Sequence, residues 1–210
     1  MDFSLTNEQK MIIDTLKTFV EQELYPHEME VEKTNQIRPE LVAQIKQKAL
    51  DLGLYAANMP EEHGGAGLDT LTLCLMEREL GRANFGLQYI VARPSNILLA
   101  CKGDQIENYL LASIRGDKVD CLAMTEPNAG SDVRSMQCRA ERNGDTFVIN
   151  GTKHFISHAD AADFVILFAA SGVEQTSRGP KKKITSFLID KGTPGFTVES
   201  GAPDSTVKPG

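Results

Sequence analysis

The chain has 210 residues, of which 41% are hydrophobic and 24% charged, an ordinary globular composition that allows one large domain or two small ones. Its net charge of −7 disfavours a general nucleic-acid-binding protein, because such proteins need a basic face. No apolar stretch approaches the roughly 20 residues that span a bilayer, and the four cysteines form no CxxC pair, so zinc and redox motifs are not expected.

The first part of the chain, residues 1–118, has the patterns of a helical domain. Thr6 and Gln9 are spaced as a capping box at a helix start, and apolar residues recur after them at helical spacing. Asp69 can cap a later helix that Gly81 would end. Three more helical stretches are expected, at about 39–52, 88–100 and 104–115.

After Gly116 the patterns become those of a β-domain, residues 119–210. Asn143-Gly144 and Asn150-Gly151 are typical of tight hairpin turns, and two such turns in close succession predict a meander of antiparallel strands. The expected strands are 136–142, 145–149, 152–157, 164–169, 184–189 and 196–199.

A lysine-containing segment, residues 171–183, separates two of these strands and is expected to be a solvated hairpin loop. The alternative is a phosphate-binding role for Lys181–Lys183. Together these patterns predict an α+β protein, with an N-terminal all-helical domain followed by a small antiparallel β-barrel or sandwich.

The most informative stretch for chemistry is 121–132. A hydrophobic strand leads into a turn at Pro127, and the small residue Gly130 leaves room for a flat or charged ligand at the backbone. The hydroxyls of Thr125 and Ser131 can donate and accept, and turn amides can bind an anion. From these residues alone a structural turn is favoured, and a polar loop for a phosphate or heterocycle stays open.

Four segments, in order along residues 1–199, resemble the acyl-CoA dehydrogenase family. Residues 123–132, Ala-Met-Thr-Glu-Pro-Asn-Ala-Gly-Ser-Asp, resemble the family's first signature, and 150–157, Asn-Gly-Thr-Lys-His-Phe-Ile-Ser, its second flavin segment. Residues 59–68 and 190–196 resemble a loop between helices and a later strand and turn. Any one of these matches would be only moderately specific for the family, whereas the four together are specific.

The resemblance implies FAD-dependent α,β-dehydrogenation of an acyl-CoA thioester. Thr125 would hydrogen-bond to the flavin ring, Ser131 would contact the pyrophosphate or the CoA portion of the substrate, and Ser157 would lie near the reactive N5. Phe155 stands where the family commonly has tryptophan, and phenylalanine lacks the indole donor. The implied cofactor-binding residues are Leu122, Ala123, Met124, Thr125, Gly130, Ser131, Phe155, Ile156 and Ser157.

No catalytic residue and no metal ligand is predicted in this chain. Glu126 would be structural or cofactor-adjacent, and the pair His154 and His158 would need a helix to bind zinc. The family's base comes from a C-terminal helical bundle, and nothing after Phe196 resembles it. The chain is therefore expected to be an N-terminal half, whether a fragment, a truncated form or an incomplete gene product. By itself it should bind FAD weakly or not at all, and it should show no detectable dehydrogenation of acyl-CoA thioesters.

The implied partners are an acyl-CoA thioester and an electron-transfer flavoprotein or similar acceptor, without nucleic acid or a membrane span. The full-length protein is expected to be a homo-oligomer in the cytoplasm, or in the mitochondrial matrix of a eukaryote, since the cysteines are expected to be reduced. Two alternatives stay open: an acyl-CoA oxidase or flavin monooxygenase of similar fold, and a non-catalytic fragment or assembly module.

Overall fold

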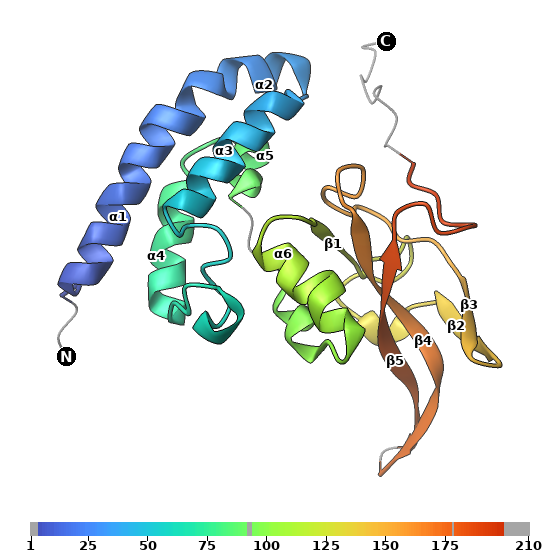
Figure 1. Ribbon diagram of the computed structural model, residues 1–210. Coiled ribbons are helices and arrows are strands. Elements are labelled where there is room, and N and C mark those ends of the chain that lie inside the picture. Colours follow the sequence, from blue (N-terminus) through green and yellow to red (C-terminus); the bar gives the residue numbers. More distant parts are fainter. Residues whose placement is uncertain (1–3, 92–93, 178, 200–210) are drawn as a thin grey trace. The chain divides into compact units, whose positions relative to one another are not determined.

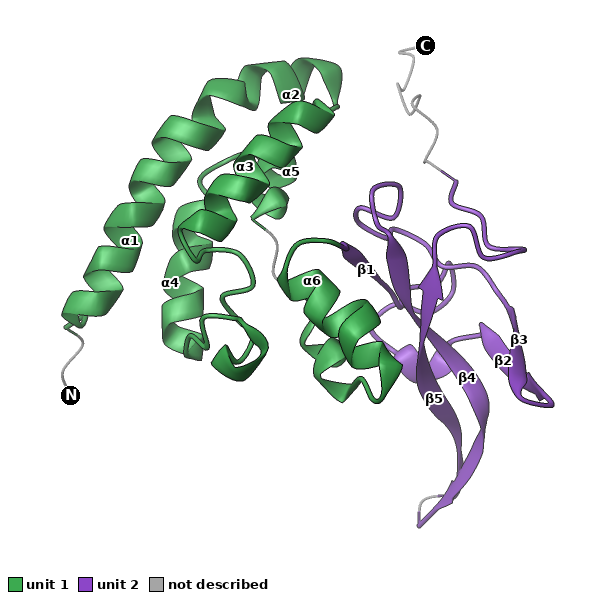
Figure 2. Ribbon diagram, viewed as in Figure 1, with its two compact units in different colours: residues 1–117 green, residues 118–210 purple. Residues whose placement is uncertain are grey.

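Figure 1 shows the computed structural model of the chain, which describes residues 4–91, 94–177 and 179–199. The chain divides into two compact units, residues 1–117 and 118–210 (Figure 2). The mixed content of helix and sheet predicted from the sequence is confirmed. Within the described ranges, every helix is too short or too polar to cross a membrane.

Helices are the only regular elements among the described residues of the first unit. The α-helices are α1 (Asn7–Phe19), α2 (Glu28–Thr34), α3 (Pro39–Asp51), α4 (Thr70–Leu80), α5 (Phe85–Ile90) and α6 (Ala112–Ile114). Two π-helical segments are η1 (Val20–Leu24) and η5 (Ile106–Leu111), and three 3₁₀ segments are η2 (Tyr25–His27), η3 (Glu61–His63) and η4 (Asn96–Ala100).

The helix starts follow the predicted capping chemistry. Thr6 and Gln9 bond reciprocally at the start of α1, each at 3.1 Å, which satisfies amides that the helix leaves open. Asp69 accepts from two amides at the start of α4, at 2.8 and 3.1 Å, and Gly81 follows the end of that helix. The stretches expected at 88–100 and 104–115 contain shorter helical pieces than predicted.

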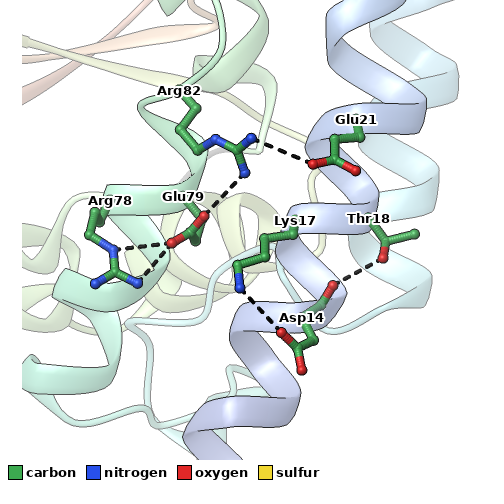
Figure 3. A network of polar contacts seen from close by, with 7 residues as sticks. All are labelled: Asp14, Lys17, Thr18, Glu21, Arg78, Glu79 and Arg82. Carbon is green, nitrogen blue, oxygen red and sulfur yellow. Dashed lines mark hydrogen bonds and ion pairs between the residues drawn. The ribbon is translucent and has the colours of Figure 1, made fainter.

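The acidic side chain of Glu79 on α4 binds Arg82, which in turn reaches η1 (Figure 3). The Glu79 side chain is only 7% exposed and accepts from Arg78 at 2.8 Å and from Arg82 at 3.4 Å. Arg82 also reaches Glu21 at 3.5 Å. Burial alone would raise the pKa of Glu79, but the two guanidinium groups more than offset it and hold the pKa below its ordinary value.

The described residues of the second unit form one five-stranded sheet. Its strands are β1 (Asp120–Ala123), β2 (Arg139–Asn143), β3 (Thr146–Asn150), β4 (Phe164–Thr176) and β5 (Gly179–Asp190), with the 3₁₀ segment η6 (Val133–Ser135) before β2. The order is β1-β4-β2-β3, and β5 pairs with β4. The buried cluster on the sheet comprises Cys121, Ala123, Cys138, Ala140, Ala162, Val165, Leu167 and Ala169.

The expectation of a purely antiparallel sheet is wrong, and a barrel is not shown because the described sheet does not close. The sheet is open, and β4 pairs in parallel with both β1 and β2. Among the described strands, only the β2–β3 and β4–β5 ladders are antiparallel. A chain needs a connection of a dozen or more residues to return in the same direction, and residues 124–163 supply it between β1 and β4.

Segment 171–183 forms a hairpin as expected, but most of its described residues belong to β4 and β5, so the loop is shorter than predicted. Polar side chains in these strands can face water without interrupting the ladder. Two strand predictions in this unit are wrong. Residues 152–157 and 196–199 contain no strand. The first of these segments bonds to the loop after β1 instead of joining the sheet. The tail at 201–210 lies outside the described residues.

Candidate functional site

The loop after β1 is a tight turn held by its own backbone. The amide of Glu126 donates to the carbonyl of Ala129 at 2.9 Å, and the amide of Ala129 donates back at 3.2 Å. Asp132 then caps η6, accepting from the Arg134 amide at 3.1 Å and from the Ser135 hydroxyl. These bonds fix the course of the chain from the end of β1 to the start of β2.

The segment after β3 lies directly against this loop. The amide of His154 donates to the carbonyl of Thr125 at 2.9 Å. Gly151 lies so close to Cys138 that a side-chain carbon added to the glycine would stand 2.6 Å from both the Cα and the Cβ of that cysteine. The two stretches singled out in the sequence are therefore neighbours, joined by backbone contacts.

A buried ion pair lies between the two stretches. Lys153 Nζ donates to Glu126 Oε1 at 2.8 Å and to the carbonyl of Met124 at 2.9 Å. The Glu126 carboxylate also accepts from the backbone amides of Gln137 at 2.6 Å and Cys138 at 3.0 Å. The lysine side chain is 6% exposed and the glutamate side chain 4%.

The environment of Glu126 keeps its carboxyl group ionised. Burial on its own would raise the pKa, but hydrogen bonds from Lys153 and from the Gln137 and Cys138 amides outweigh burial and hold the pKa below its ordinary value. The carboxylate is therefore engaged by an ammonium group and two backbone amides. The sequence does not reveal its partner, because the lysine lies 27 residues away.

Phe155 is an exposed aromatic residue with an unfavourable backbone conformation. Its φ is 56°, in the left-handed region that a bulky side chain rarely adopts, and it is 83% exposed. The ring stacks on that of His154, with centroids 3.8 Å apart and planes 20° apart. Such strain persists only where the surrounding structure imposes it, and it is often found at functional sites.

Replacing Phe155 with glycine is expected to leave the free energy of unfolding unchanged or to raise it by up to about 1 kcal/mol. Little burial is lost and the left-handed strain is relieved, while glycine adds unfolded-state entropy. Urea unfolding followed by circular dichroism measures this. Phe147→Gly is the control, because Phe147 lies in β3 and packs on Phe187. Phe147→Gly should lower the free energy of unfolding by about 1–2 kcal/mol. An equal loss in Phe155→Gly and Phe147→Gly would contradict the expectation.

The predicted cofactor-binding residues differ in what they can offer a ligand. The side chain of Ala123 is buried in the sheet core, and that of Ile156 is half-buried against it. Met124 and Thr125 are half-buried. The remaining predicted residues are exposed: Leu122, Gly130, Ser131, Phe155 and Ser157.

A polar cavity of about 450 Å³ opens beside the turn. It is lined by Glu126, Pro127, Asn128, Gln137, Cys138, Arg139, Asn150, Gly151 and Thr152. None of the predicted cofactor-binding residues is among them. A second cavity, of about 640 Å³, lies in the helical unit between α1, η1 and α3, and it too contains none of them.

Comparison with known families identifies both units. Residues 6–117 match the model of the acyl-CoA dehydrogenase N-terminal domain, and residues 121–208 match that of the acyl-CoA dehydrogenase middle domain. The chain belongs to the acyl-CoA dehydrogenase family. The resemblance seen in the sequence motifs is confirmed.

Individual relatives and solved structures agree with this assignment. Benzylmalonyl-CoA dehydrogenase of Aromatoleum aromaticum is 35% identical over 203 residues, covering 94% of this chain and 51% of the relative. The structure of butyryl-CoA dehydrogenase from Megasphaera elsdenii matches with a TM-score of 0.75 at 32% identity, covering 94% of this chain and 52% of that one. An FAD complex of PigA matches with a TM-score of 0.81 at 28% identity, covering 97% and 53%. The chain spans about half the length of the curated relatives it matches.

Proposed function

We propose that this chain forms one wall of the flavin site in an FAD-dependent acyl-CoA dehydrogenase. The observation that carries the proposal is the 2.9 Å bond from the His154 amide to the Thr125 carbonyl, which sets the two signature stretches side by side. One stretch offers a half-buried hydroxyl and the other an exposed aromatic face at Phe155. A hydroxyl and an aromatic face on neighbouring segments are the groups with which we propose that the chain binds the flat flavin ring.

The turn beyond Thr125 fits the charged part of the same cofactor. A side-chain carbon built on Gly130 would meet no other atom within 4 Å, so a ligand can approach this backbone closely. Ser131 beside it is exposed and has a hydroxyl that can donate to a phosphate oxygen. FAD bound here supplies the acceptor for the substrate hydride, and the residues of this chain bind and orient it.

The proton chemistry of the reaction is assigned to other residues. Glu126 is held by Lys153 and two backbone amides, and Asp132 by the cap of η6, so neither is placed as a free base. We propose that the carboxylate that takes the α-proton lies in the half of the relatives that this chain does not span. The substrate proposed for the whole protein is an acyl-CoA thioester, with Ser131 near its CoA portion or the flavin pyrophosphate.

The remaining features of the whole protein follow the family. We propose an electron-transfer flavoprotein or a similar acceptor as the partner that reoxidises the flavin, and a homo-oligomer as the working form. The cysteines at 74, 101, 121 and 138 are free thiols. They fit the cytoplasm, or the mitochondrial matrix of a eukaryote, because thiols persist in reducing compartments.

Binding of FAD to the 210-residue chain tests the proposal. In an NMR titration, which detects weak binding, FAD is expected to shift amides in 122–131 and 153–157. Thr125→Ala and Ser131→Ala should each raise the Kd about fivefold, the loss of one hydrogen bond of about 1 kcal/mol. Thr197→Ala, at an exposed position of the same unit, should not change it. No shift in either segment, or equal Kd values for all variants, would refute the flavin site.

Activity is tested by joining the chain to the second half of the Aromatoleum relative. Acyl-CoA thioesters of several lengths should bleach the flavin absorbance, and the reduced flavin should reoxidise faster with an electron-transfer flavoprotein than in air. Faster reoxidation in air would instead favour an oxidase. No bleaching by any thioester in a folded, flavin-loaded fusion would count against dehydrogenation.

A further inference from the structure

Lys153 is in an unusual place for a lysine. Its side chain is 6% exposed, whereas lysines are almost never fully buried unless they are paired. Desolvating a lysine and a glutamate together costs several kcal/mol per ion, and an apolar pair of similar volume is often as stable. Global stability alone therefore gives little reason for a charged pair at this position.

The pair joins three separate parts of the chain. Lys153 follows β3 and bonds to the carbonyl of Met124, which follows β1. Glu126 bonds to the amides of Gln137 and Cys138, which precede β2. No ladder pairs β1 with β2 or β3 among the described strands, so these bonds hold the loop after β1 against the segments that flank the hairpin.

The residues next to the pair are those proposed to face the flavin. Thr125 lies between Met124 and Glu126, the two residues that Lys153 contacts. His154 follows Lys153, bonds to the Thr125 carbonyl and stacks on Phe155. The left-handed conformation of Phe155 needs such an anchor, because the preferred conformations of a bulky residue lie elsewhere.

We propose that Lys153 and Glu126 are a positioning pair, which sets the separation of Thr125 from Phe155 and so the shape of the proposed flavin wall. The part of this proposal that concerns FAD rests on the proposed function. The part that concerns the two segments does not. A directional hydrogen bond from a buried ammonium group can fix the relative position of two segments, whereas apolar contacts allow them to shift. Buried polar groups serve this purpose in other folds.

The test compares the 210-residue chain with the double variant Glu126→Gln/Lys153→Met. Replacing both charges leaves no unpaired ion, so thermal unfolding should remain close to that of the wild type. The His154 amide, which reports the contact between the segments, should exchange with solvent at least about tenfold faster. Lys153→Arg keeps the charge and the donors, so exchange should stay within about threefold of the wild type. If the double variant does not fold, Glu126→Asp is measured instead, because it keeps both charges but shortens the acidic side chain, and faster exchange is expected again.

The flavin readout separates positioning from a purely structural role. In the folded double variant, the Kd for FAD should rise about fivefold or more, and the shift of the Phe155 amide on adding FAD should shrink. Unchanged exchange at His154 would overturn the positioning pair, whatever FAD does. Faster exchange with unchanged FAD binding would overturn its link to the flavin. If the wild type shows no response to FAD, the proposed function fails, and His154 exchange alone decides whether the pair positions the segments.

Discussion

Lys153→Met is expected to lower the free energy of unfolding of the second unit by about 3–5 kcal/mol at neutral pH. Methionine fills a similar volume but leaves the Glu126 carboxylate, 4% exposed, without its counter-ion. It also removes the donor to the Met124 carbonyl. Breaking one side of a buried pair is costly because the remaining charge keeps its desolvation penalty.

Urea unfolding measures this effect, with two signals. The chain has no tryptophan, and its four tyrosines, at 25, 55, 89 and 109, all lie in the first unit, so tyrosine fluorescence reports that unit. The circular dichroism of the sheet reports the second unit, where the larger shift is expected. Lys118→Met is the matched control, because Lys118 pairs with Asp190 at 3.3 Å on the surface. The Lys118→Met variant should lose no more than about 1 kcal/mol of unfolding free energy. Equal losses in Lys118→Met and Lys153→Met would contradict the importance of burial.

The difference in the free energy of unfolding between the wild type and Lys153→Met should become smaller as the pH falls. The ordinary pKa of Glu126 is 4.5, and the folded wild type holds it lower. The stabilisation from this group is therefore complete above pH 4.5 and is lost as the pH falls through the folded-state pKa. In the variant, burial without the lysine favours the protonated carboxyl, which removes the unpaired charge. A gap that stays constant or widens in acid would contradict this account.

Gly151→Ala is expected to destabilise the second unit by about 2–6 kcal/mol. The φ of Gly151 is 152°, which side-chain-bearing residues rarely adopt. The added carbon would also stand 2.6 Å from the backbone and side chain of Cys138, and 2.8 Å from its sulfur. Relief needs movement of the backbone, because the nearest atom is a Cα and not the end of a flexible side chain.

Gly172→Ala separates the two causes. Gly172 has nearly the same backbone angle, with φ at 156°, but a carbon added there meets no atom within 4 Å. Its cost should be the backbone term alone, about 1–3 kcal/mol. Urea unfolding of both variants under the same conditions gives the steric term by difference. If Gly172→Ala costs as much as Gly151→Ala, the close packing on Cys138 is not what requires glycine at 151.

Local signals in the sequence were sufficient for two capped helix starts and for the family. Thr6 with Gln9, and Asp69, cap helices as predicted, because a cap bond joins residues only two or three positions apart. The first Asn-Gly dipeptide lies at the β2–β3 hairpin, with Gly144 at φ 61°. The signature stretches identified the family because each is a run of adjacent residues.

The same kind of signal failed where the partner is distant in the chain. The second Asn-Gly dipeptide resembles the first, yet Gly151 leads into a segment that bonds to the loop after β1 and forms no strand. The parallel pairing of β4 with β1 joins Asp120 to Phe164 and leaves no mark in either strand alone. A turn dipeptide restricts its own backbone angles, and what the next residues pair with depends on the remainder of the sheet.

The amino-acid sequence by itself determined the helical and strand-rich parts, the capped helix ends and the family. Only the tertiary structure revealed that Lys153 is buried against Glu126, that Phe155 is held exposed in a left-handed conformation, and that the sheet is open with mixed pairing. Capping and turn formation depend on neighbours along the chain. Burial of a charge, strain at a residue and the direction of strand pairing depend on contacts between residues tens of positions apart, and these contacts exist only once the chain has folded.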